Sequence, residues 1–134
     1  MKILSPAKIN LFLQVTGKRP DGYHELFSLM CCVDLCDTIF LQFGVKNIRV
    51  ESSHPQIPFD DTNLAHRAAV VFFKALNVND GLKIFIDKSI PVAAGLGGGS
   101  SNAASVLKGL NQHYGYPFSR NELMSMGLGL GADV

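Results

Sequence analysis

The chain has almost no net charge, and this limits the partners it suits. Its 134 residues carry a formal net charge of +1, and no run of lysine and arginine is long enough to form a basic patch. We therefore expect no general binding to nucleic acid or to a membrane surface, because both need a dense positive field. No apolar run reaches the length that spans a bilayer. The stretch 1–6 is too short, and too soon interrupted, to be a signal peptide.

Cysteine is scarce and unevenly placed. Cys31, Cys32 and Cys36 lie close together in an apolar stretch. An odd number in such a run favours reduced thiols in the core of a cytoplasmic protein. A metal site is the alternative, but Cys31 and Cys32 would point to opposite faces of a strand. No second Cys/His pair completes a tetrahedral set, so we expect reduced core thiols.

The order of the expected elements predicts an α+β domain. With 47% apolar residues, the chain can bury one core. Strands come first and helices mostly later, which favours α+β over a doubly wound sheet. A cap at Thr62 or Asn63 opens one helix, and a capping box over 119–122 opens another. The expected strands are near 7–17, 26–34, 38–43, 46–52 and 82–88, and the expected helices cover 62–76, 100–112 and a short stretch after 119.

The stretch 91–104 is the most informative part of the sequence. It reads Pro-Val-Ala-Ala-Gly-Leu-Gly-Gly-Gly-Ser-Ser-Asn-Ala-Ala and leads from an expected strand into an expected helix. Glycine allows close approach of the backbone to a ligand, and a helix N-terminus offers free N–H donors and partial positive charge. We expect Ser100 and Ser101 to cap this helix. The stretch therefore predicts a site for a nucleotide or another phosphorylated ligand.

Two common glycine motifs are excluded by missing residues. A P-loop needs Gly-Lys-Ser/Thr, and here Gly99 is followed by Ser100 with no lysine. The dinucleotide fingerprint would end on Ser100 instead of Gly or Ala, and no acidic residue lies between Asp87 and Glu122. A flexible linker is the remaining alternative, but a linker would be polar on both sides.

Lys8 and Asn10 share the polar face of a strand whose other face carries Ile9, Leu11, Leu13 and Val15. The pattern alone favours a solvated surface for Lys8 and Asn10. Taken alone, Asp133 is a turn residue after the last helix.

Three pieces of the chain together resemble a known kinase family. They are residues 6–26, which begin Pro-Ala-Lys-Ile-Asn-Leu and end Asp-Gly-Tyr-His-Glu-Leu, the stretch 91–104, and Met-Gly-Leu-Gly-Leu-Gly-Ala-Asp-Val at 126–134. The middle piece is similar to the phosphate loop of the superfamily that includes galactokinase, homoserine kinase, mevalonate kinase and phosphomevalonate kinase. The outer pieces resemble the 4-diphosphocytidyl-2-C-methyl-D-erythritol kinases of non-mevalonate isoprenoid (terpenoid) biosynthesis.

This resemblance implies a fold and a reaction. The fold would be the two-layer α+β N-terminal domain of these kinases, with some similarity to a ribosomal protein S5 domain. The reaction would move the γ-phosphate of ATP, accompanied by Mg²⁺, to the 2-hydroxyl of a cytidine diphosphate conjugate of methylerythritol. Lys8 and Asp133 match the catalytic pair. Asp133 would take the hydroxyl proton or orient the hydroxyl, and Lys8 would keep Asp133 ionised and steady the developing charge.

The remaining site residues also follow from the resemblance. Asn10 would bind the methylerythritol hydroxyls, Tyr23 would stack on the cytosine, and His24 would bind its edge. Asn63 and Lys88 match positions near the adenine. The ATP phosphates would be wrapped by Pro91, Val92, Ala93, Ala94, Gly95, Leu96, Gly97, Gly98, Gly99, Ser100 and Ser101. No residue is assigned as a direct metal ligand. Relatives often carry glycine where Ala93 and Ala94 stand, which predicts a stiffer start to the loop.

Simpler interpretations stay open for several positions. Tyr23 could be turn packing, His24 a surface histidine, Lys88 an ordinary strand-end lysine, and Asn63 a helix cap. Two other functions also stay open. One is a kinase of the same superfamily with another acceptor, such as homoserine, mevalonate or a sugar, and the other is a nucleotide-binding module without catalysis. Because the sequence stops in mid-pattern after Asp133, we expect a second lobe to follow Val134, without which the 134-residue chain would lack part of its pocket.

Overall fold

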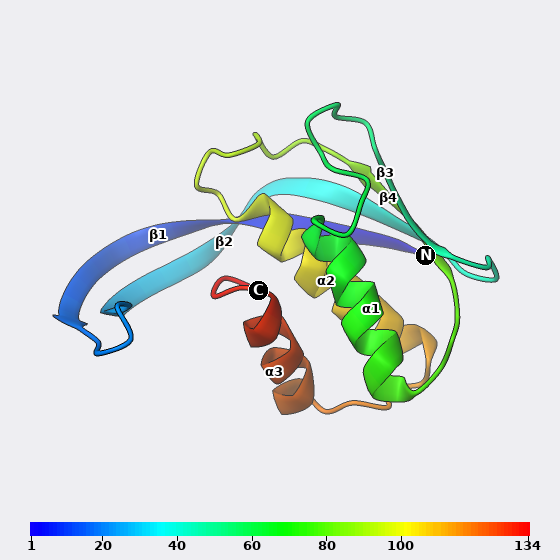
Figure 1. Ribbon diagram of the computed structural model, residues 1–134. Helices are drawn as coiled ribbons and strands as arrows, with labels where there is room; N and C mark the ends of the chain where they lie inside the picture. The colour runs from blue at the N-terminus through cyan, green and yellow to red at the C-terminus, as the bar shows by residue number, and fades with distance from the viewer.

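Four strands form one sheet, α1 and α2 pack against one of its faces, and α3 packs against these two helices (Figure 1). The computed structural model describes residues 1–134. The strands follow the order β1-β2-β4-β3, in which β3 and β4 are parallel and the other pairs antiparallel. This confirms the predicted α+β class with two layers. The elements are β1 (Lys2–Lys18), β2 (His24–Gln42), β3 (Ile48–Ser52), α1 (Leu64–Leu76), β4 (Leu82–Asp87), α2 (Gly98–His113) and α3 (Arg120–Leu130).

The core lies between the helices and the inner half of the sheet. On β4, Leu82, Ile84 and Ile86 alternate with more exposed residues, as a strand with one buried face should. Phe72 of α1 is fully buried and packs edge-on against the ring of Phe118. Truncation of such a buried ring to alanine costs about 3–5 kcal/mol. The remaining buried apolar residues come mainly from β2, α1 and α2.

Helix termini follow local signals in two cases and depart from them in one. Asn63 caps α1, with its Oδ1 accepting from Ala65 N at 2.8 Å, so the cap is Asn63 and not Thr62. The capping box of Ser119 and Glu122 opens α3 as predicted. The expected start of α2 was wrong: the helix begins at Gly98, capped by a glycine and by no side chain.

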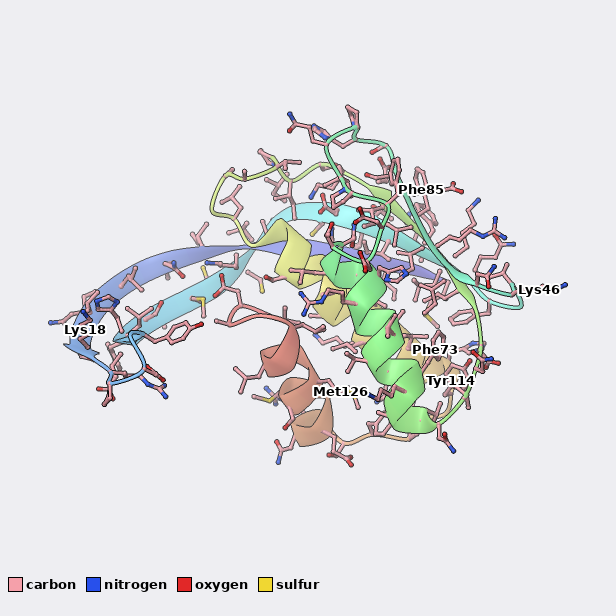
Figure 2. The ribbon with its side chains drawn as sticks, in the orientation of Figure 1. Lys18, Lys46, Phe73, Phe85, Tyr114 and Met126 are labelled. Atoms are coloured by element: carbon pink, nitrogen blue, oxygen red, sulfur yellow. The ribbon has the colours of Figure 1, made fainter.

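The outer parts of β1 and β2 form a curved arm that extends beyond the helices (Figure 1). The expected strands 26–34 and 38–43 are one strand, because β2 keeps pairing with β1 across the expected gap, where Asp37 lies opposite Ser5. Register shifts at Asn10/Phe12 and Val15/Gly17 interrupt the strict alternation assumed from the sequence. Leu11, Phe12, Leu13 and Val15 are all exposed. In Figure 2, Lys18 lies at the tip of the arm, far from Phe73 in the core.

The cysteines lie outside the core, contrary to expectation. All three are free thiols on β2, with Cys32 exposed and Cys31 and Cys36 half-buried. Their apolar neighbours indicated a core strand, but no helix covers the arm that carries Cys31 and Cys32. No helix is both long and apolar enough to cross a membrane.

Candidate active site

The glycine-rich loop leaves the start of α2 open to a ligand. Gly95 (φ 74°) and Gly97 (φ 67°) have the left-handed backbone conformation that glycine adopts without strain. Ala93 has the same left-handed conformation (φ 57°), which a residue with a Cβ adopts only with strain. Gly97 caps α2 without a side chain. The first N–H groups of α2 are therefore free to bind an anion.

Ser100 and Ser101 do not cap α2, because both lie inside its first turn. Their side chains also differ in direction. Ser100 lines the cavity described below, whereas Ser101 Oγ pairs with Ser5 Oγ at 2.9 Å. The same Ser5 hydroxyl lies 2.9 Å from Asn102 Oδ1, and both Ser5 and Asn102 are buried. Ser101 therefore joins α2 to β1, and its side chain is not part of the cavity wall.

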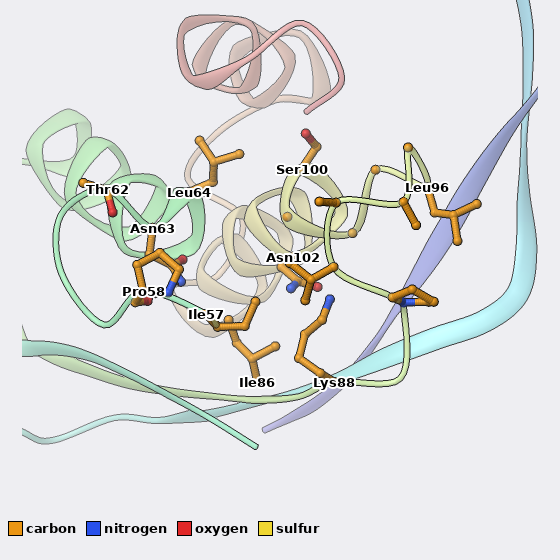
Figure 3. A pocket seen from close by; sticks show the side chains of 18 residues that line it. Ile57, Pro58, Thr62, Asn63, Leu64, Ile86, Lys88, Leu96, Ser100 and Asn102 are labelled. Carbon is orange, nitrogen blue, oxygen red and sulfur yellow. Dashed lines mark hydrogen bonds between the residues drawn. The ribbon is translucent and has the colours of Figure 1, made fainter. Parts of the chain in front are cut away.

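A cavity of about 400 Å³ opens between the glycine-rich loop and the start of α1 (Figure 3). Every residue expected to bind ATP lines it except Ser101. Its other wall is largely apolar and was not predicted from the sequence. The apolar residues of this wall are Ile57, Pro58, Leu64 and Ile86. A slot with apolar walls at one end and free N–H groups at the other suits a planar base joined to phosphates.

Both polar atoms of the Asn63 side-chain amide form structural hydrogen bonds. Its Oδ1 caps α1, and its Nδ2 donates to Pro58 O at 2.8 Å. Asn63 lines the cavity and also fixes Pro58 in the cavity wall. The simpler interpretation of Asn63 as a helix cap is confirmed. A direct contact to adenine stays a prediction.

Lys88 also lines the cavity, and its ammonium group has a partner that the sequence analysis did not identify. Lys88 Nζ lies 2.5 Å from Asp37 Oδ2, and the two side chains are 4% and 0% exposed. Asp37 belongs to β2, far from Lys88 in sequence. Asp34 stands three residues earlier in the same apolar stretch, so no sequence signal singled out Asp37.

Lys8 and Asp133 meet beside the glycine-rich loop. Lys8 Nζ lies 3.4 Å from Asp133 Oδ2, and the Lys8 side chain is 18% exposed. The backbone N–H of Lys8 donates to Leu96 O at 2.9 Å, which ties β1 to the loop. A Cβ on Gly97 would lie 2.8 Å from Lys8 Cγ, so the loop packs directly on the lysine. Lys8 therefore does not lie on the solvated surface that the alternation alone favoured.

The residues expected to bind the second substrate lie further out. Asn10 is exposed on the arm, two residues beyond Lys8. Tyr23 is 74% exposed in the turn at the tip, and His24 pairs with Lys18 at the end of the ladder. From Lys8 to Lys18 the strand is on the order of 30 Å long at its usual rise per residue. The structure brings Lys8, Asp133 and the loop together but leaves Tyr23 and His24 at the tip.

Comparison with known proteins identifies the family of this loop and its surroundings. The family described as GHMP kinases N terminal domain matches residues 63–134, which is more than half of the chain. The chain belongs to the GHMP kinases. The glycine-rich loop and Asp133 fall within the matched residues, whereas Lys8 precedes them.

Among the GHMP kinases, the chain is similar in sequence to curated kinases that share one name. The 4-diphosphocytidyl-2-C-methyl-D-erythritol kinase of Clostridium tetani is 45% identical over 100% of this chain and 48% of its own length. That of Syntrophotalea carbinolica is 52% identical over 98% of this chain and 47% of its own length. The chain thus spans about half the length of the curated relatives it matches.

Solved structures support the same fold. A crystal structure of 4-(cytidine 5'-diphospho)-2C-methyl-D-erythritol kinase matches with a TM-score of 0.81 and 39% identity, over 100% of this chain and 47% of that one. The mevalonate kinase of Methanococcus jannaschii matches with a TM-score of 0.72 and 22% identity, over 99% of this chain and 46% of that one. At that identity the second match supports the fold alone.

Proposed function

We propose that the polypeptide carrying this chain transfers the γ-phosphate of ATP to the 2-hydroxyl of 4-diphosphocytidyl-2-C-methyl-D-erythritol. The observation that carries the proposal is the ion pair of Lys8 and Asp133 beside an open, glycine-capped helix N-terminus. The identity to kinases of that name supports the choice of acceptor. The cytoplasm is the compartment this proposal assumes, and three free cysteines are consistent with it.

In the proposed reaction, the acceptor oxygen bonds to the γ-phosphorus as the bond from that phosphorus to the bridging oxygen breaks and ADP leaves. Asp133 accepts the hydroxyl proton. Lys8 pairs with the Asp133 carboxylate and holds it in place, and it stabilises charge on the transferred group. The N–H groups at the start of α2 hold the phosphates, and the apolar wall with Ile57 and Pro58 holds the adenine.

Mg²⁺ would accompany ATP and neutralise part of the phosphate charge. No group of three His, Cys, Asp or Glu side chains is arranged to hold a metal ion. The cavity lining contains hydroxyls, including that of Ser100, but no carboxylate. This fits an ion whose ligands are mostly phosphate oxygens and water, with Ser100 as a candidate protein ligand.

A second candidate is a kinase of the same family with another small alcohol as acceptor. The exposed position of Tyr23 at the tip of the arm favours this alternative, because an acceptor without a base needs no contact there. A binding module without catalysis is less favoured, since pure nucleotide binding needs neither Lys8 nor Asp133.

The test is ADP release from ATP and Mg²⁺ by the longest native polypeptide that contains this sequence. The acceptors are the diphosphocytidyl conjugate, its cytidine-free analogue, homoserine and mevalonate. We expect turnover with the conjugate only. Turnover with another acceptor would keep the kinase and reject the cytidine pocket, and ATP binding without any turnover would favour the binding module.

A further inference from the structure

Asp37 is a buried carboxylate that the proposed reaction does not use. It lies on β2 opposite Ser5 of β1, and its side chain is 0% exposed. A carboxylate removed from water costs several kcal/mol unless hydrogen bonds and an opposite charge compensate it. The partners of Asp37 therefore indicate what keeps it there.

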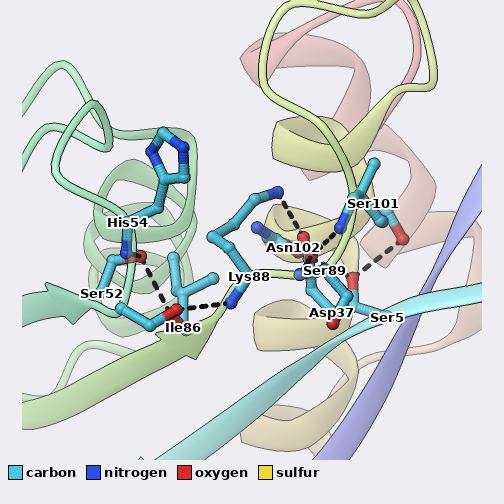
Figure 4. A network of polar contacts seen from close by, with 11 residues as sticks. Ser5, Asp37, Ser52, His54, Ile86, Lys88, Ser89, Ser101 and Asn102 are labelled. Atoms are coloured by element: carbon cyan, nitrogen blue, oxygen red, sulfur yellow. Dashed lines mark hydrogen bonds and ion pairs between the residues drawn. The ribbon is translucent and has the colours of Figure 1, made fainter.

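All the donors to Asp37 come from three consecutive residues. Lys88 Nζ lies 2.5 Å from Oδ2, and the backbone N–H groups of Ser89 and Ile90 each donate to Oδ1 at 2.8 Å (Figure 4). These residues connect β4 to the glycine-rich loop. The backbone N–H of Lys88 donates to Ser53 Oγ at 2.9 Å. Residues 88–90, which lead into the glycine-rich loop, are thus held by Asp37 of β2 on one side and by Ser53 on the other.

The Lys88 ammonium lies between this anchor and the nucleotide cavity. Lys88 is part of the cavity lining. A Cβ on Gly98 would lie 3.1 Å from Lys88 Nζ, so the ammonium sits against the first residue of α2. A helix N-terminus carries partial positive charge and disfavours a cation beside it. The negative charge of Asp37 offsets that repulsion and holds the ammonium at the cavity wall.

We propose that Asp37 is a positioning residue for ATP, and that it acts by holding the Lys88 ammonium in the wall of the nucleotide cavity. This inference rests on the proposed function, because it assumes that the cavity takes ATP. Asp37 touches neither substrate nor reacting atoms. It therefore affects ATP affinity and leaves the chemical step and the acceptor unaffected.

An exclusively structural role would have a different outcome. Removing one partner of a buried ion pair can destabilise a fold by several kcal/mol, so unfolding is measured beside ATP affinity to separate a loss of fold from a loss of binding. Asp37→Asn separates the two roles of Asp37, because it keeps an acceptor oxygen for the Ser89 and Ile90 N–H groups and removes the charge.

The experiment uses the longest native polypeptide and measures the Kd of ATP by titration calorimetry, together with kcat, both KM values and urea unfolding. The variants are Asp37→Asn, Lys88→Met and the double variant. The matched control is Glu51→Gln, which breaks the ion pair of Lys83 and Glu51 on the sheet outside the cavity.

We expect Asp37→Asn and Lys88→Met each to raise the Kd of ATP by roughly tenfold or more, as loss of one partner of a buried pair does. The acceptor KM and kcat at saturating ATP should stay near wild type. The double variant should bind ATP about as Lys88→Met does, because residues that act through one another are not additive. Glu51→Gln should match wild type.

If the Kd of ATP rises in the double variant by the product of the two single-variant increases, Asp37 and Lys88 act independently and the inference is overturned. An ATP affinity equal to wild type in Asp37→Asn would also overturn it. If Asp37→Asn does not fold, Lys88→Met and the double variant still decide. Wild-type affinity in Lys88→Met, or a further loss in the double variant, overturns the inference. A wild-type protein that binds no ATP would overturn the proposed function and this inference together.

Discussion

Lys8 Nζ lies 3.4 Å from Asp133 Oδ2, although the two residues stand near opposite ends of the chain. The Asp133 side chain is 47% exposed, so solvent screens the pair. A partly exposed pair of this kind contributes about 0–1 kcal/mol to stability. Its position beside the glycine-rich loop therefore matters more for chemistry than for folding.

Replacing Asp133 by asparagine should remove proton acceptance while leaving the fold intact. We expect turnover to fall about 10²–10⁴-fold, the usual contribution of a general base. ATP affinity and the midpoint of urea unfolding should stay near wild type. ADP release and ATP titration measure the two effects, with Glu51→Gln as the control. Unchanged turnover would remove Asp133 from the mechanism.

Gly97 and Gly95 form a matched pair for testing contact between the loop and Lys8. Both have positive φ, so alanine at either costs about 1–2 kcal/mol of backbone strain. Only at Gly97 would the new Cβ meet Lys8, at 2.8 Å from its Cγ, whereas nothing lies within 4 Å at Gly95. Gly97→Ala should therefore lower turnover much more than Gly95→Ala. ADP release together with urea unfolding checks this, and equal losses of turnover would mean that the contact is unimportant.

Tyr23 and His24 test the choice of acceptor. If the cytosine stacks on Tyr23, Tyr23→Ala should raise the KM of the cytidine conjugate about tenfold or more, since stacking on one base contributes about 1–3 kcal/mol. His24→Ala should raise the same KM, and neither variant should change the KM of ATP. Unchanged KM values would favour an acceptor without a base.

Tyr114 should contribute a pH dependence at alkaline pH. Burial, followed by a hydrogen bond to the Asp80 carboxylate, raises the pKa of Tyr114 from 10.0 to about 12. The unfolded chain loses this proton near pH 10 and the folded chain near pH 12, so the unfolded state binds fewer protons in that window. Stability should therefore fall as pH rises from about 10 to about 12. The slope should be shallower in Tyr114→Phe, as urea unfolding across this range would measure, and identical slopes would contradict the assignment.

Local signals were sufficient for the starts of α1 and α3 and for recognising the glycine-rich loop. The caps at Asn63 and Ser119 bind backbone N–H groups within three residues of themselves, so such caps can be predicted without knowing the fold. Glycine permits positive φ, but only the structure shows that Gly95 and Gly97 adopt it whereas Gly98 and Gly99 do not. The start of α2 was wrong by two residues, because Gly98 and Gly99 are helical and only tertiary packing supports helix at such positions.

Pairings between distant segments could not be predicted in this way. Nothing local connects Asp37 to Lys88, or Ser101 to Ser5, because each pair is made by packing β1 and β2 against the loop and α2. The apolar wall with Ile57 and Pro58 had no periodicity to mark it. The alternating pattern of residues 7–17 also gave a wrong expectation for the arm. Register shifts break the alternation, and no helix covers the apolar side chains of the arm.

The sequence by itself determined the element types, the capping box of α3 and a glycine-rich loop before a helix, because these depend on backbone preferences and on neighbours a few residues away. The family resemblance had implied that Lys8 and Asp133 act together, but only the tertiary structure showed that Lys88 meets Asp37. Such pairs depend on strand register and on the layer that covers each strand. Both are settled by burial across the whole domain, which no short stretch of sequence contains.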